Sequence, residues 1–143
     1  MKTAMKKILA IVLSATLLTL STGACSDPTP PAAPTPVTPT ITDTFTGTLT
    51  LSGNNTHPFT VSQVGGLRVS LTVVSPSAAV GIGVGTPSTA TGTCTVLANM
   101  TAVGGPGYQM LGTATVTGTF CIAVFDVGNL VESVDYTVTV LHS

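Results

Sequence analysis

Three carboxylates in the last part of the chain are the residues most able to do chemistry together. Asp126, Glu132 and Asp135 lie around a short stretch of turn-forming residues, 127–131. A carboxylate pair can act as the acid and base of a hydrolase when the pKa of one is raised, and carboxylate oxygens also bind calcium. Solvation of a hairpin loop is the simpler explanation, because loops commonly carry polar side chains. We keep a calcium site as the alternative and assign no metal or cofactor.

The two histidines do not add a catalytic group to these acids. His57 precedes a predicted strand and His142 is the penultimate residue, so we expect both at exposed strand ends. Neither accompanies a nucleophile motif such as G-x-S-x-G. The glycines of residues 81–85 lack the spacing of a dinucleotide-binding loop and favour a strand that a neighbour approaches closely. Since no nucleophile, base and orienting group can be assembled, the sequence predicts a protein that is not an enzyme.

Two of the three cysteines are expected to form a structural bridge. Cys94 and Cys121 are the only cysteines left in the chain once Cys25 is assigned a separate role, which predicts a disulfide in an exported domain. Their spacing is far from the C-x-x-C of redox and metal sites. The bridge would close a loop of about 28 residues and stabilise the fold by about 3.5 kcal/mol.

The first residues have the pattern of a secretory signal. Three lysines in the first seven positions precede an apolar run over residues 8–20, and small residues follow as far as position 24. The run is shorter than the roughly 20 apolar residues of a transmembrane helix. We therefore expect residues 1–24 to be a signal peptide and the protein to be exported.

The end of this segment, Thr22-Gly23-Ala24-Cys25, resembles the lipobox of bacterial lipoproteins. In that family the cysteine is lipidated and becomes the new N-terminus after cleavage. The stretch departs from the family pattern at Thr22, where an aliphatic residue is preferred. The resemblance implies a lipid on Cys25 and anchoring in the bacterial cell envelope, at the outer membrane or the cell surface. Ordinary cleavage after Ala24, which would leave a free thiol, is the alternative.

A proline-rich stretch follows the predicted lipidation site. Residues 25–42 contain six of the ten prolines, interleaved with Thr and Ala. Proline lacks an N–H group and pushes the preceding residue into extended geometry. We expect a semi-rigid tether that reaches on the order of 50 Å; an O-glycosylated stalk is another use of this composition.

The chain carries little charge. Only 6% of its residues are charged while 43% are hydrophobic, against about a quarter charged in ordinary soluble domains. After removal of the signal peptide, the chain would contain one Lys or Arg, Arg68, and five Asp or Glu residues. Its net charge would be 1 − 5 = −4. This excludes nucleic-acid binding through phosphate neutralisation.

Residues 43–143 alternate apolar and polar side chains and show no sustained 3.6-residue period. The apolar positions predicted to face inward are Phe45, Leu49, Leu51, Phe59, Val61, Leu67, Val69, Leu71, Val73, Val80, Ile82, Val84, Ala114, Val116, Phe120, Ile122, Val124, Tyr136, Val138 and Val140. A further strand is expected at 93–97. The pattern predicts an all-β fold, a single antiparallel β-sandwich of about eight short strands, with a small closed barrel as the alternative.

Two aromatic side chains remain as candidates for facing a ligand. Alternation leaves Tyr108 and Phe125 outside the core, unlike the other four aromatic residues. The glycine-rich stretch 102–109 carries Tyr108 and is predicted to be an irregular loop, which suits a ligand-facing element. A flexible connection between strands is the alternative.

Several segments resemble the bacterial pre-peptidase C-terminal domain. Residues 118–126 (GTFCIAVFD) and 135–140 (DYTVTV) are similar to its closing hairpin, and 58–61 with 65–72 to its opening strands. The resemblance covers residues 43–143 and implies a β-sandwich accessory module of secreted hydrolases or envelope proteins, without catalysis of its own. Residues 77–84, in place of the family's acidic strand, contain no acid, so calcium is not implied there.

Together these features predict a noncatalytic lipoprotein of the cell envelope. We expect the module to stand alone behind its tether, held at the membrane by its N-terminal lipid, and to serve interaction or adhesion with envelope proteins or glycans. A glycan-binding accessory module of a secreted hydrolase system is the alternative. No nucleic acid is expected among the partners.

Overall fold

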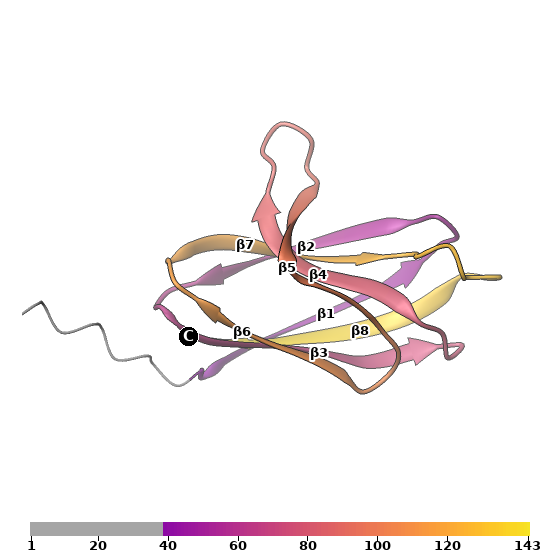
Figure 1. Cartoon of the computed structure of the whole chain (residues 1–143), viewed down its shortest axis with the longest axis horizontal. Coiled ribbons are helices and arrows are strands. Elements are labelled where there is room, and N and C mark those ends of the chain that lie inside the picture. The colour runs from indigo at the N-terminus through magenta and orange to yellow at the C-terminus, as the bar shows by residue number, and fades with distance from the viewer. Residues whose placement is uncertain (1–38) are drawn as a thin grey trace, which may run out of the picture. The chain divides into compact units, whose positions relative to one another are not determined.

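The computed structural model describes residues 39–143; the predicted signal peptide, Cys25 and most of the predicted tether lie outside the described residues. The described part folds into two four-stranded antiparallel sheets (Figure 1). Its strands are β1 (Ile41–Leu49), β2 (Asn54–Val61), β3 (Gly65–Ser75), β4 (Val80–Pro87), β5 (Cys94–Gly104), β6 (Tyr108–Ala114), β7 (Gly118–Phe125) and β8 (Val134–His142). The predicted all-β sandwich of about eight antiparallel strands is confirmed. Within residues 39–143, no helix is long and apolar enough to cross a membrane.

The two sheets enclose one hydrophobic core. The first sheet has the order β1-β8-β3-β6 and the second the order β2-β7-β4-β5. Because successive side chains of a strand point to opposite faces, each strand supplies every second residue to the space between the sheets. Leu49, Leu71, Ile82, Ile122 and Tyr136 are among the largest of these buried side chains. The outer face of the first sheet is rich in threonine instead.

Three positions predicted to face inward are exposed, which corrects the predicted core. Leu51 and Val116 lie in the connections after β1 and β6, where strand alternation has ended. Val73 lies on β3, but the register of β3 against β8 shifts between Leu71 and Val73. A β-bulge of this kind inserts an extra residue and reverses which side chains point inward. Val74 is buried in its place.

Alternate glycines on β4 allow the second sheet to be covered on its outer face as well. Val80, Ile82 and Val84 face the core, so Gly81, Gly83 and Gly85 face away from it. All three glycines are nevertheless buried. A Cβ atom on Gly81 would collide with the ring of Phe125, one on Gly83 with Val96, and one on Gly85 with the backbone of Thr95. The prediction that these glycines permit a close approach is confirmed.

The disulfide lies on the same outer face. Cys94 of β5 is bonded to Cys121 of β7, with the two Cα atoms 5.8 Å apart. In the sheet β4 separates these strands, and Gly85 is the β4 residue paired with Cys121. Because Gly85 has no side chain, the beginning of β5 can pass over β4 and reach β7. The predicted Cys94–Cys121 bridge is confirmed.

The region around β5 and β6 is more regular than the sequence suggested. The strand predicted at 93–97 extends as far as Gly104, with a register shift against β4 between Gly83 and Gly85. The loop predicted at 102–109 is reduced to a turn at 105–107, because its other residues belong to β5 and β6. The expectation of an irregular 102–109 loop is therefore wrong.

The alternating strand directions place the connections at two opposite ends of the sandwich. We call the end where β1 begins the proximal pole; β8 also ends there, and Arg68 lies near it at the start of β3. We call the other end the distal pole. It gathers the β1–β2, β3–β4, β5–β6 and β7–β8 connections, three of which appear together at the right of Figure 1. Every second connection of the chain therefore contributes to one surface.

Replacement of Gly85 by alanine tests the close approach of β5. The new Cβ atom would meet backbone atoms of Thr95, which cannot rotate away, so we expect Gly85→Ala to lower the free energy of unfolding by about 1–3 kcal/mol. Gly105→Ala is the matched control, because a Cβ atom there makes an ordinary contact with the carbonyl oxygen of Ala78 at 3.5 Å. Chemical denaturation of both variants measures the difference, and equal stabilities would contradict the crossing of β5 over Gly85.

Candidate functional site

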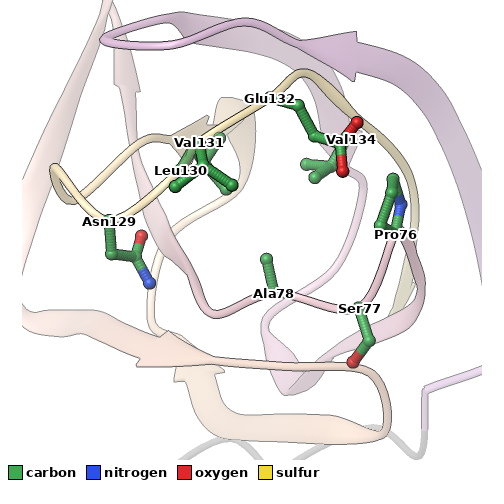
Figure 2. Close-up of a pocket in the computed structure, with 8 residues that line it drawn as sticks. All are labelled: Pro76, Ser77, Ala78, Asn129, Leu130, Val131, Glu132 and Val134. Carbon is green, nitrogen blue, oxygen red and sulfur yellow. The ribbon is translucent and has the colours of Figure 1, made fainter.

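An open cavity of about 260 Å³ lies at the distal pole between the β3–β4 and β7–β8 connections (Figure 2). We call it the distal cavity. Its walls are mostly apolar, and three polar side chains complete its lining. The lining residues are Pro76, Ser77, Ala78, Asn129, Leu130, Val131, Glu132 and Val134. In Figure 2 the carboxylate of Glu132 lies on the same side as Pro76, and Asn129 lies on the opposite side.

Asp126 fixes the loop that forms one wall of this cavity. Its Oδ1 atom accepts backbone N–H groups of the loop, from Gly128 at 2.8 Å, Asn129 at 3.2 Å and Leu130 at 3.3 Å. Its Oδ2 atom accepts the N–H group of Ser52, in the β1–β2 turn, at 2.8 Å. These hydrogen bonds, the one from Ser52 first, lower the pKa of Asp126. Asp126 therefore joins two distal connections and has a structural role.

The three predicted carboxylates do not form a single site. Asp135 accepts a hydrogen bond from the Thr48 hydroxyl at 2.6 Å and borders a separate hollow with Thr46, Val73 and other residues of the first sheet. Glu132 lies at the distal cavity, and Asp126 is held by backbone groups as described above. In the described range 39–143, no three His, Cys, Asp or Glu side chains are grouped so that they could hold a metal ion. The three acids are close in sequence, and this closeness gave no sign that they lie on different surfaces.

Glu132 differs from the other acids of the described part of the chain. Asp43 contacts His142, Asp126 binds backbone N–H groups and Asp135 binds Thr48. For the Glu132 carboxylate, no hydrogen bond or ion pair with any residue of 39–143 is found. Among the four Asp and Glu side chains of residues 39–143, it is thus the one without a hydrogen-bond or ion-pair partner in the fold.

His142 is buried and His57 is partly buried within β2, so the expectation that both are exposed at strand ends is wrong. His142 is only 1% exposed, and its Nε2 atom lies 2.9 Å from Oδ2 of Asp43. His57 is partly buried in β2, where it stacks on Phe45 and shares a 2.7 Å hydrogen bond with the Tyr136 hydroxyl. Burial lowers the pKa of His57 and raises that of Tyr136. The two histidines reach these positions because strands far apart in sequence pair with one another. No local sequence pattern indicates their burial.

The two aromatic candidates belong to different sheets, Tyr108 to β6 of the first sheet and Phe125 to β7 of the second. Tyr108 pairs with the buried Leu71 and packs against the core, with its ring next to Gly104. It is therefore not a free ligand platform. Phe125 lies over Gly81 on the outer face, where its register neighbour is the exposed Asn54. No joint ligand-binding surface of Tyr108 and Phe125 exists.

The hydrogen bonds of Asp126 predict how stability depends on pH. Because they favour the charged carboxylate, the pKa is lower in the folded than in the unfolded chain. The stabilisation is complete above the unfolded pKa and is lost as the pH falls through the folded pKa. We expect Asp126→Asn to lower the Tm at neutral pH and to match the wild type in strong acid. Thermal unfolding at a series of pH values measures this.

Glu132→Gln is the matched control for this measurement at neutral pH, since it makes the same change in charge on the same loop. Its carboxylate accepts no hydrogen bond from the described residues, so we expect the Tm to stay near that of the wild type. A Tm deficit of Asp126→Asn that persisted undiminished in strong acid would contradict the role assigned to the carboxylate charge.

Comparison with known protein families and curated proteins finds no relative of this chain. No protein-family model matches the chain, and no curated protein matches it. The resemblance to the pre-peptidase C-terminal domain stays a prediction based on the segments given above.

Proposed function

We propose that this protein is a noncatalytic, lipid-anchored module of the bacterial cell envelope that binds a partner through its distal pole. The observation that carries the proposal is the position of the distal cavity, which lies at the opposite end of the strands from the point where the tether enters β1. A module held by its N-terminus would present that end to its surroundings. Interaction or adhesion at the cell surface is the corresponding role.

The distal pole also has exposed apolar side chains suited to a protein contact. Leu51 of the β1–β2 turn is 50% exposed, and Val131 beside the distal cavity is 88% exposed. Val127, also exposed, lies on the loop that Asp126 holds against the β1–β2 turn. Exposed apolar side chains beside a hollow are suited to a protein contact; Leu111 and Val116, also exposed, lie outside this pole. The Cys94–Cys121 disulfide supports an extracytoplasmic location, since such bonds persist in oxidising compartments.

The contacts that the polar side chains make within the fold support a binding role over catalysis. Within residues 39–143, His57 and His142 each contact another side chain of the fold, and Asp126 holds backbone groups. These groups stabilise the sandwich and its loops. Catalysis would need a nucleophile, a base and an orienting group directed at one point.

A glycan-binding accessory module is the second candidate. The observation in its favour is Phe125, an aromatic side chain on the outer face of the second sheet beside the exposed Asn54. An aromatic ring next to an amide offers both stacking and hydrogen bonds to a sugar. Phe125 is the last residue of β7 and Asn54 the first of β2, so this pair borders the distal pole, although the distal connections themselves carry no aromatic residue.

The anchor is tested by replacing the predicted lipidated residue. We expect Cys25→Ala to move the protein from the membrane fraction to the soluble fraction and to abolish incorporation of labelled palmitate. The double variant Cys94→Ala/Cys121→Ala is the control, because it removes two cysteines but leaves residues 22–25 intact. Membrane retention and unchanged labelling of Cys25→Ala would contradict lipid anchoring at this residue.

The binding surface is tested by photo-cross-linking in intact cells. A photoreactive residue replaces Val131 at the distal pole or, as the matched control, Val116 in the proximal β6–β7 connection; both valines are exposed. We expect adducts of defined mass from position 131 and few from position 116. Adducts of equal yield at both positions, or from position 116 alone, would contradict distal binding.

A further inference from the structure

We propose that the distal cavity binds the side chain of a lysine or arginine presented by a protein partner, with Glu132 as its counter-ion. This inference rests on the proposed function and names the chemistry of the partner. Three properties of the cavity carry it: its lining, its electrostatics and its size.

The lining matches a long side chain with a charged end. Pro76, Ala78 and Leu130 belong to the apolar walls, against which the methylene groups of a lysine or arginine can pack. Such side chains bury their stems on apolar surface while the charged group stays at the edge. At the edge of the cavity Glu132 offers a carboxylate, and Asn129 lines the opposite side (Figure 2). A purely apolar ligand would instead remove water from the Glu132 carboxylate without replacing its hydrogen bonds.

The charge distribution selects a cation. Residues 39–143 contain four acids and one Lys or Arg, so their formal charge is 1 − 4 = −3 with neutral histidines. Asp126, Glu132 and Asp135 all lie at the distal pole, whereas Arg68 lies toward the proximal pole. Of the described acids, Glu132 alone makes no hydrogen bond or ion pair within 39–143. An anionic partner would be repelled, and a cationic partner would be attracted.

The ligand set excludes a calcium ion as the occupant. The volume of the cavity, about 260 Å³, accommodates a single long side chain. Calcium needs six to eight oxygen ligands, and Glu132 is the only carboxylate lining the cavity. The exposed Val131, which also lines the cavity, provides an apolar contact for the residues that flank the inserted side chain.

The purified full chain is tested on an array of hexapeptides with randomised flanks. The central residue is lysine, arginine, glutamate or norleucine, which keeps the lysine stem and removes its charge. We expect lysine and arginine peptides to bind about two- to fivefold more tightly than norleucine peptides, because Glu132 is exposed, with a preference that declines at high salt. Glu132→Gln should abolish this preference and keep the wild-type Tm at neutral pH.

Asp135→Asn is the matched control, because it removes the same charge at the same pole but outside the cavity. It should keep the preference for lysine and arginine. An equal loss of the lysine and arginine preference in both variants would show a general effect of negative charge. It would overturn the role of Glu132 as the counter-ion. Equal binding of norleucine and lysine peptides would overturn the charge recognition. Free spermidine competing as strongly as the peptides would overturn a protein partner as the source of the cation.

Failure of this inference is distinguishable from failure of the proposed function. One outcome is that the photoreactive residue at position 131 yields adducts in cells while Glu132→Gln binds peptides as the wild type does. In that case distal binding stands and the assignment of the cavity to a cationic side chain is wrong. If Val131 yields no adducts but the array shows the lysine preference, the cavity chemistry stands and the cellular role is wrong.

Discussion

The lack of side chains at alternate positions of β4 decides how the second sheet is built. Gly81, Gly83 and Gly85 leave room on the face turned away from the core, and Phe125, Val96 and the backbone of Thr95 fill it. Strand β4 is therefore covered on both faces, whereas the first sheet has a core face and a threonine-rich outer face. The Cys94–Cys121 bridge depends on the same space, since it joins β5 to β7 across β4.

The distal pole has a different organisation, in which one carboxylate determines the backbone of two connections. Asp126 accepts N–H groups from its own loop and from the β1–β2 turn, and the N–H group of Asp126 donates to the carbonyl of Gly53 at 3.0 Å. The loop that carries Glu132 and Val131 is thus held at its start. A fixed backbone with exposed side chains costs less conformational entropy on binding than a flexible loop.

The strands and their inward faces were predictable, because burial on one side imposes a two-residue period that the sequence displays. The disulfide was predictable from the count of cysteines together with the predicted signal peptide. Three other features were not. The bulge that exposes Val73 depends on the register between β3 and β8. The burial of His142 depends on Asp43, which lies 99 positions away in sequence. Sequence proximity grouped Asp126 with Asp135, but strand direction and hydrogen bonding assign them to different surfaces. All three features depend on pairing between strands that are far apart in sequence. The alternation of apolar and polar residues within one strand does not reveal it.

The pairing of β1 with β8 has a mechanical consequence for an anchored module. The two strands are antiparallel and in register over nine residue pairs, from Ile41 with His142 to Leu49 with Val134. In the proposed arrangement, a partner pulling on the distal pole and a tether pulling on the start of β1 apply force along the strand axis. The hydrogen bonds of this pair are perpendicular to that force, so they are loaded together in shear and do not open one after another. The strand nearest the anchor is in this respect suited to transmit tension without unfolding first.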